Sequence, residues 1–156
     1  MPNHIYNKLT ITGDNEILKQ FVNDIRGDEE TIDFEKLYPI ASQNWYDWCV
    51  KHWSTKWNAY EIDNDWIINN RCQTIKYQTA WSPPINFYLH VSKMYPTLEF
   101  KQEYVDEGGN FVGDMIIING QIIKQNDYQW NSSPGITLRS LLDPYYKDEN
   151  EDENDG

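Results

Sequence analysis

The last third of the chain contains three segments of alternating polar and apolar residues, separated by two turn sequences. The segments cover residues 98–104, 111–118 and 121–128; the turns are Gly108-Gly109-Asn110 and Asn119-Gly120. Alternation with a period of two is typical of strands buried on one face. Asn-Gly between two such runs is a strong signal for a two-residue hairpin. The sequence therefore predicts a three-stranded antiparallel meander.

Two strands, each followed by a helix, are predicted upstream of this meander. Residues 5–12 and 75–81 alternate in the same way, and a short apolar run at residues 66–68 precedes the second of them. Helix signals follow both strands. Asp14 is an N-cap candidate for a helix over 17–25, and Ser82-Pro83 predicts a helix that runs to about Met94.

This order of elements predicts an α+β fold. Two strand–helix–strand units with a hairpin between them indicate a ferredoxin-like split βαβ antiparallel sheet with two helices on one face. An added C-terminal β-hairpin strand and an aromatic-rich insertion over residues 44–57 complete the prediction. We expect the other face of the sheet to be open or to be covered by the aromatic segment.

Acidic residues outnumber basic ones, 25 to 13, for a formal net charge of −12. Six of the carboxylates lie after residue 147, where no apolar side chain could offset the entropy of ordering. We therefore predict a single domain over residues 1–147 and a disordered acidic tail over 148–156. The tail carboxylates are candidates for contact with a partner: Asp148, Glu149, Glu151, Asp152 and Glu153.

The charge also bears on the kind of partner. Phosphate contacts need Lys and Arg, so direct binding to nucleic acid is not expected. An acidic surface can instead compete with nucleic acid for a basic protein. The sequence has neither a secretory leader nor an 18-residue apolar run, so we expect a cytoplasmic protein with no membrane contact. The oligomeric state is left open.

No motif for catalysis, cofactor binding or metal binding is present. Cys49 and His52 have metal-like spacing, but a structural zinc site needs four such ligands and only one pair occurs. We interpret the pair as a packed cysteine and a surface histidine. We predict no catalytic residues, no cofactor and no metal.

Seven tryptophans are present, four of them between residues 45 and 57. One interpretation places Trp48, Trp57 and Trp81 in a second small core that closes the open face. The other makes the cluster a binding surface, because Trp and Tyr anchor interfaces. Both can hold together, with some rings inside and Trp45, Tyr46 and Trp53 at the rim. Residues 55–57 and 79–81 would meet if the segment folds back. The interaction candidates are Trp45, Tyr46, Asp47, Trp48, Trp53, Lys56, Trp57 and Trp81.

Three stretches of the sequence resemble a known family. They are Met1-Pro2-Asn3 with Asn7, Leu9, Ile11 and Gly13; Trp45-Tyr46-Asp47-Trp48 through Trp53, Thr55-Lys56-Trp57 and Ala59; and Thr79-Ala80-Trp81-Ser82-Pro83-Pro84. Together they resemble the uncharacterised phage- and plasmid-borne YubB ferredoxin-like family. Where that pattern has glycine this chain has Ser54, and His4-Ile5 replaces an aromatic–cysteine pair. The resemblance implies a ferredoxin-like mobile-element protein in a bacterial cytoplasm, with no iron–sulfur cluster and no assigned activity.

Our first functional hypothesis is a non-enzymatic accessory protein of a phage or plasmid. It would bind and inhibit a host protein, such as a nucleic-acid-handling defence complex of the kind blocked by anti-CRISPR or anti-restriction proteins. Carboxylates would occupy a basic channel while aromatic anchors supply contact area.

Two alternatives stay open. The sheet could bind single-stranded nucleic acid by stacking bases on Tyr6, Tyr77 and Tyr104, as RNA-recognition modules do. Alternatively, the protein could be an enzyme with dispersed residues; those considered are Asp47, His52 and Lys56.

Overall fold

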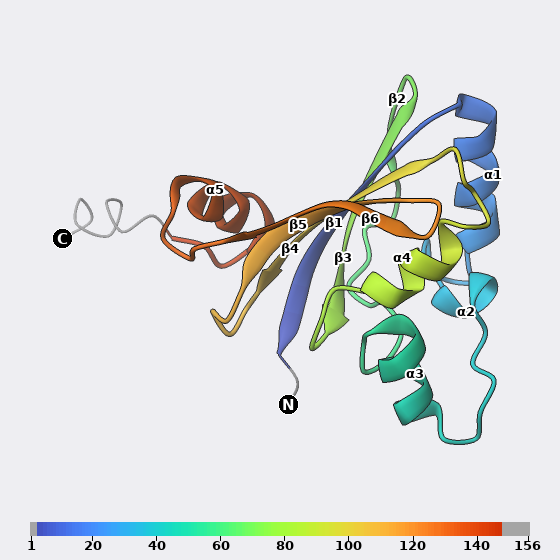
Figure 1. Ribbon diagram of the computed structural model, residues 1–156, viewed down its shortest axis with the longest axis horizontal. Helices are drawn as coiled ribbons and strands as arrows, with labels where there is room; N and C mark the ends of the chain where they lie inside the picture. Colours follow the sequence, from blue (N-terminus) through green and yellow to red (C-terminus); the bar gives the residue numbers. More distant parts are fainter. Residues whose placement is uncertain (1–2, 148–156) are drawn as a thin grey trace.

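A six-stranded sheet forms the centre of the structure, a computed structural model that describes residues 3–147 (Figure 1). The strand order is β2-β3-β1-β4-β5-β6, and all neighbouring strands are antiparallel. The strands are β1 (His4–Thr12), β2 (Ile67–Asn69), β3 (Cys72–Ala80), β4 (Glu99–Asp106), β5 (Val112–Ile118) and β6 (Gln121–Tyr128). The portion β2-β3-β1-β4 is the split βαβ arrangement. The predicted α+β ferredoxin-like fold is therefore confirmed, and the C-terminal hairpin adds two strands to it.

Four helices lie on one face of this sheet, to its right in Figure 1. They are α1 (Asn15–Ile25), α2 (Phe34–Leu37), α3 (Trp45–Trp53) and α4 (Ile85–Val91). The side chain of Asp14 accepts hydrogen bonds from the backbone N–H groups of Glu16 and Ile17, which caps α1 as predicted. Leu18, Phe21 and Ile25 then lie on one face of α1 and are buried against the sheet.

The aromatic segment belongs to this helix-covered face, which corrects one expectation. Trp48 and Trp53 of α3 join the main core and do not close the opposite face of the sheet. The opposite face is partly covered by α5 (Ser133–Leu142), a helix that was not predicted from the sequence. Leu138 and Leu142 of α5 pack there on Tyr6, Val105 and Val112 in a second, smaller core. We call this side of the sheet the open face.

A line of hydrogen-bonded polar side chains runs through the main core. Asn7 donates to the hydroxyl of Thr79 and accepts from the amide of Gln102, at 2.9 and 2.8 Å. The Tyr77 hydroxyl donates to Gln102 at 3.1 Å and also bonds the hydroxyl of Tyr88 at 2.8 Å. These side chains satisfy one another away from water, so they fix the register of β1, β3 and β4.

The Asn119-Gly120 turn forms as predicted, whereas the second predicted helix begins later than predicted. Asn119 and Gly120 both have positive φ angles, 48° and 76°, as a type I′ hairpin turn requires. Helix α4, in contrast, begins at Ile85 and not at Ser82, and it ends at Val91. Ser82 provides a backbone acceptor for the Thr79 hydroxyl, at 2.7 Å. The Ser-Pro pair therefore belongs to the turn after β3.

Candidate functional site

Helix α3 divides the tryptophan cluster between core and surface. Trp48 and Trp53 are buried, and the Trp53 indole N–H donates to the carbonyl of Tyr38 at 3.0 Å. Trp45 and Tyr46, in the first turn, are 49% and 37% exposed. The predicted rim position is thus wrong for Trp53, whose ring packs edge-on against Phe34 inside the core.

The exposed rings gather around one lysine. The Lys56 ammonium lies 4.7 Å from the ring centre of Trp57, 5.1 Å from that of Trp81 and 6.0 Å from that of Tyr46. Trp81 is 40% exposed, contrary to the small-core interpretation, and Tyr46 packs edge-on between it and Trp45. We call these five residues the aromatic patch. A cation held on several ring faces is attracted by their quadrupoles.

Two backbone hydrogen bonds hold this patch in place. The N–H of Lys56 donates to the carbonyl of Ala80 at 3.2 Å, so residues 55–57 and 79–81 meet as predicted. The N–H of Trp81 donates to the carbonyl of Asn3 at 3.0 Å. All three stretches of the family resemblance therefore converge here. Trp81 also has a φ of 79°, a left-handed conformation that costs a non-glycine residue free energy.

The residues considered for catalysis make separate contacts. Asp47 accepts from the amide of Asn44 at 2.7 Å, and His52 bonds the hydroxyl of Tyr38 at 2.8 Å. Lys56 lies among the aromatic rings. Cys49 is buried, and burial, with a smaller contribution from the charge of Glu35, raises the pKa of its thiol to about 11. A thiol with that pKa stays protonated near neutral pH and is a poor nucleophile.

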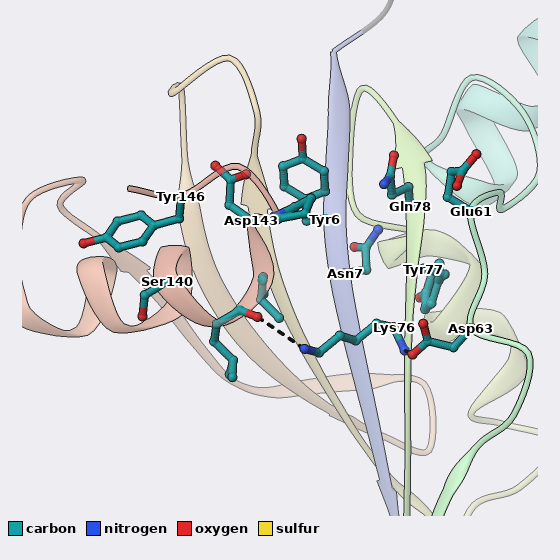
Figure 2. A pocket seen from close by; sticks show the side chains of 13 residues that line it. Tyr6, Asn7, Glu61, Asp63, Lys76, Tyr77, Gln78, Ser140, Asp143 and Tyr146 are labelled. Atoms are coloured by element: carbon teal, nitrogen blue, oxygen red, sulfur yellow. Dashed lines mark hydrogen bonds between the residues drawn. The ribbon is translucent and has the colours of Figure 1, made fainter. Parts of the chain in front are cut away.

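A second candidate site lies on the open face, between α5 and the segment 60–63 that pairs with β3 (Figure 2). It consists of two adjoining hollows of about 470 Å³ each that share Tyr6, Glu61 and Gln78. We call it the sheet groove. Its polar and aromatic lining comes from β1, β3, the segment 60–63, the β4–β5 turn and the residues after α5: His4, Tyr6, Tyr60, Glu61, Asp63, Lys76, Gln78, Glu107, Asp143, Tyr145 and Tyr146.

Carboxylates set the electrostatic character of the sheet groove. The pKa of the Tyr6 and Tyr60 hydroxyls is raised to about 12, mainly by burial and to a smaller extent by nearby negative charges. For Tyr6 the strongest of these charges is Asp143; for Tyr60 it is Glu107. Ionisation of the two phenols is therefore opposed first by burial and then by the negative charge that the groove already carries.

The groove was not predicted from the sequence, although it is lined by Tyr6, one of the three tyrosines predicted to stack on bases. Tyr77 and Tyr104 are buried beneath the helix-covered face, 2% and 3% exposed, and Tyr6 is covered beside α5. Buried rings cannot stack on nucleic-acid bases, so the hypothesis of base stacking on these tyrosines is wrong in its geometry. Tyr6 in β1 and Gln78 in β3 both occupy positions of the alternating pattern that face away from the main core. That pattern was the available signal for the groove.

The tail candidates, Asp148, Glu149, Glu151, Asp152 and Glu153, lie outside the described residues. Within residues 3–147, no group of three or more His, Cys, Asp or Glu side chains is placed to hold a metal ion. None of the helices in that range is long and apolar enough to cross a membrane.

Comparison with known proteins relates the chain to one family. The family model described as a ferredoxin-like domain in Api92-like proteins matches residues 52–154. Among solved structures, the chain is similar to the crystal structure of protein Api92 from Yersinia pseudotuberculosis, with a TM-score of 0.52 and 12% sequence identity. That likeness covers 62% of this chain and 39% of the Api92 chain, so it extends over about two fifths of that protein and concerns the fold alone. No match was found among curated proteins.

Proposed function

The chain belongs to the family of ferredoxin-like domains in Api92-like proteins, and from this premise we propose that it is a non-enzymatic protein-binding domain. In its finer form, the proposal is that a phage or plasmid uses the domain to bind and inhibit a host protein that handles nucleic acid. The resemblance to the YubB ferredoxin-like family supports this mobile-element context.

The aromatic patch is the observation that carries the proposal. Trp45, Tyr46 and Trp81 are large side chains with 37% to 49% of their surface exposed to solvent. Trp48 and Trp53, in contrast, are buried in the core beside them. Exposed aromatic side chains that gather at one place are typical of binding surfaces, because Trp and Tyr supply contact area at a small cost in conformational entropy.

The charge of the chain supports a basic partner. With 25 acidic against 13 basic residues, the protein attracts a positively charged surface and repels polyanions. A protein that normally binds nucleic acid has such a surface. Electrostatic attraction would speed its association, and the aromatic side chains would provide affinity once the surfaces are in contact.

The test is a pull-down from bacterial lysate with the tagged full-length chain. Captures at low and high salt, with and without nuclease, are compared for the native protein and for a Trp45→Ala/Tyr46→Ala variant. We expect a stoichiometric protein that survives nuclease and weakens at high salt. We expect the double variant to capture at least tenfold less of this protein.

The matched control is Ile67→Ala/Ile68→Ala, which removes two exposed apolar side chains from the short edge strand β2. It should capture the same protein as the native chain. A partner counts only if the purified protein also binds the purified chain directly. Capture that disappears with nuclease, or that is equal for both double variants, would contradict the proposal.

A further inference from the structure

The sheet groove is a second surface with a chemistry of its own. We propose that it binds an extended, arginine-containing segment of a partner protein, with guanidinium groups held between tyrosine rings and carboxylates. The inference rests on the proposed function in one respect, that the partner is a protein. It adds a site on the open face of the sheet and names the chemistry that the site recognises.

The carboxylates of the groove are available to an incoming cation. Four of them line it, Glu61, Asp63, Glu107 and Asp143. Among the described residues, the salt bridges engage only Glu107 of these four, through a 3.9 Å contact with His4. Glu61, Asp63 and Glu107 are exposed and Asp143 is half-buried, so all four can be reached by a ligand in the groove. Carboxylates accept strong, charge-assisted hydrogen bonds from a guanidinium group.

The one lysine in the groove is directed away from these acids. The Lys76 ammonium donates to the carbonyl of Leu141 at 3.3 Å, near the C-terminal end of α5 (Figure 2). Free carbonyls and the helix dipole make that end negative, so they hold the lysine there. Lys76 therefore satisfies the helix end and leaves the groove with an excess of negative charge.

The tyrosines make the groove suited to a planar cation. Tyr60 and Tyr145 line the same hollow as Glu61 and Glu107. Tyr60 is half-buried and Tyr145 is 82% exposed, so both present ring surface to a ligand. Guanidinium groups stack on aromatic faces and donate to carboxylates in the same plane, which an ammonium group cannot do as well. Arginine uses both features of this lining.

The spacing of the acids favours an extended polypeptide over a metal ion. Within residues 3–147 no three of these ligand types converge on one point, although four carboxylates line the two hollows. A chain with cationic side chains at intervals can reach separated carboxylates. A second copy of this protein, with its net charge of −12, lacks the complementary charge.

The experiment titrates the ¹⁵N-labelled full-length chain with the peptide acetyl-Gly-Arg-Gly-Arg-Gly-amide and follows amide shifts by NMR. We expect the largest shifts at His4, Tyr60, Gln78 and Glu107. The same peptide with citrulline in place of arginine keeps the shape and loses the charge, and we expect at least tenfold weaker binding from it.

The variant pair is Glu61→Gln/Glu107→Gln in the groove and Glu29→Gln/Glu30→Gln in the exposed loop before α2. Both remove two charges from the chain. The groove pair should raise the dissociation constant at least tenfold, and the loop pair less than twofold. Equal effects of the two pairs, or shifts confined to residues 148–156 or to the aromatic patch, would overturn the inference.

The two proposals fail separately in these experiments. If the peptide binds the groove but no protein is captured from lysate, the proposed function loses its support while the cation site stands. If a partner is captured through the aromatic patch but neither the peptide nor the Glu61→Gln/Glu107→Gln variant shows a groove effect, only the inference about arginine is overturned.

Discussion

The two faces of the sheet are built from the same strands and differ in what covers them. On the helix-covered face, α1 to α4 enclose one continuous core, in which Phe34 stacks on Phe87 and meets Trp53 edge-on. On the open face, α5 buries a small cluster at one end, and the sheet groove occupies the space beside it. One face therefore contributes most of the folding free energy, and the other keeps polar and aromatic side chains accessible.

This difference follows from the strand sequences. Odd-numbered positions of β1, such as Ile5, Leu9 and Ile11, face the main core, and even-numbered ones, such as Lys8 and Thr10, face the opposite way and are half-buried. A sheet with that alternation needs cover on one side only. The open face is thus free to carry side chains chosen for contact with other molecules.

The largest expected effect comes from removing one ring of the main core. Phe34 is fully buried, stacks on Phe87 with 4.1 Å between the ring centres, and meets Trp53 edge-on. We expect Phe34→Ala to lower the free energy of unfolding by about 3–5 kcal/mol, the usual range for such a cavity. Urea denaturation followed by circular dichroism measures it.

Leu138→Ala is the counterpart on the open face. Leu138 packs in the small core of Tyr6, Val105, Val112 and Leu142, and we expect a loss of about 2 kcal/mol, the low end of the range for Leu→Ala. Hydrogen exchange should become faster in α5 while β1 and β3 stay protected. If Leu138→Ala destabilises the protein as much as Phe34→Ala does, the two faces fold as one unit and the comparison fails.

The next effect concerns the tyrosines of the groove at high pH. An unfolded phenol has a pKa near 10, whereas that of Tyr6 and Tyr60 is raised to about 12, mainly by burial and then by neighbouring negative charges. Between pH 10 and 12 the unfolded state therefore loses protons first, and stability falls as pH rises. Below pH 10 both states are protonated and the effect vanishes.

The measurement compares the free energy of unfolding at pH 9.5 and pH 11.5 in the native protein and in Tyr6→Phe/Tyr60→Phe. The double variant should lose less stability over that interval. Tyr77, Tyr88, Tyr95 and Tyr104, whose pKa values are also raised by burial, contribute to a drop that remains. An identical pH dependence in the two proteins would show that the groove phenols do not sense their surroundings.

The fold was predictable because local signals and the global arrangement agree. The Asp14 cap, the Asn119-Gly120 turn and the alternation in β1, β3 and β4 each specify one element. Helix α5 was missed although its signals are present: Ser132 accepts from the N–H of Gly135, and a proline lies at its start. Gly135, an unfavourable residue within a helix, is required by close packing, because a Cβ there would meet the carbonyl of Gln129 at 2.3 Å.

The sites were less predictable, for a physical reason. Helical spacing puts Trp45 and Trp48 on one face of α3, but only the three-dimensional path of the chain decides that Trp45 extends past the edge of the core. The sheet groove depends on register. Tyr6 lies opposite Gln78, and segment 60–63 pairs with β3. No local pattern encodes where α5 crosses β4 and β5.

A smaller effect separates the aromatic patch from the core beneath it. Trp81→Ala removes the ring and keeps a left-handed backbone, whereas Trp81→Gly removes the ring and accepts the φ of 79°. We expect the glycine variant to be about 1 kcal/mol more stable than the alanine variant, because the left-handed conformation costs L-residues about that much. Both should lose the captured partner equally. If the glycine variant retained the partner, the ring of Trp81 would have no part in binding.

The smallest effect tests how α3 is attached to the helix-covered face. Ser54 ends α3 with a φ of 70°. Its hydroxyl accepts a hydrogen bond from the backbone N–H of Asn86 in the first turn of α4. The N-cap residue of α4 itself makes no side-chain capping hydrogen bond. Ser54→Ala should cost about 1 kcal/mol, because it removes that acceptor and keeps the left-handed strain. Ser54→Gly loses the same hydrogen bond but relaxes the backbone, so we expect a stability close to the native value. Thermal denaturation of the two variants measures the difference. Equal losses would mean that the left-handed angle carries no strain. A loss confined to Ser54→Gly would mean that the hydroxyl does not cap α4.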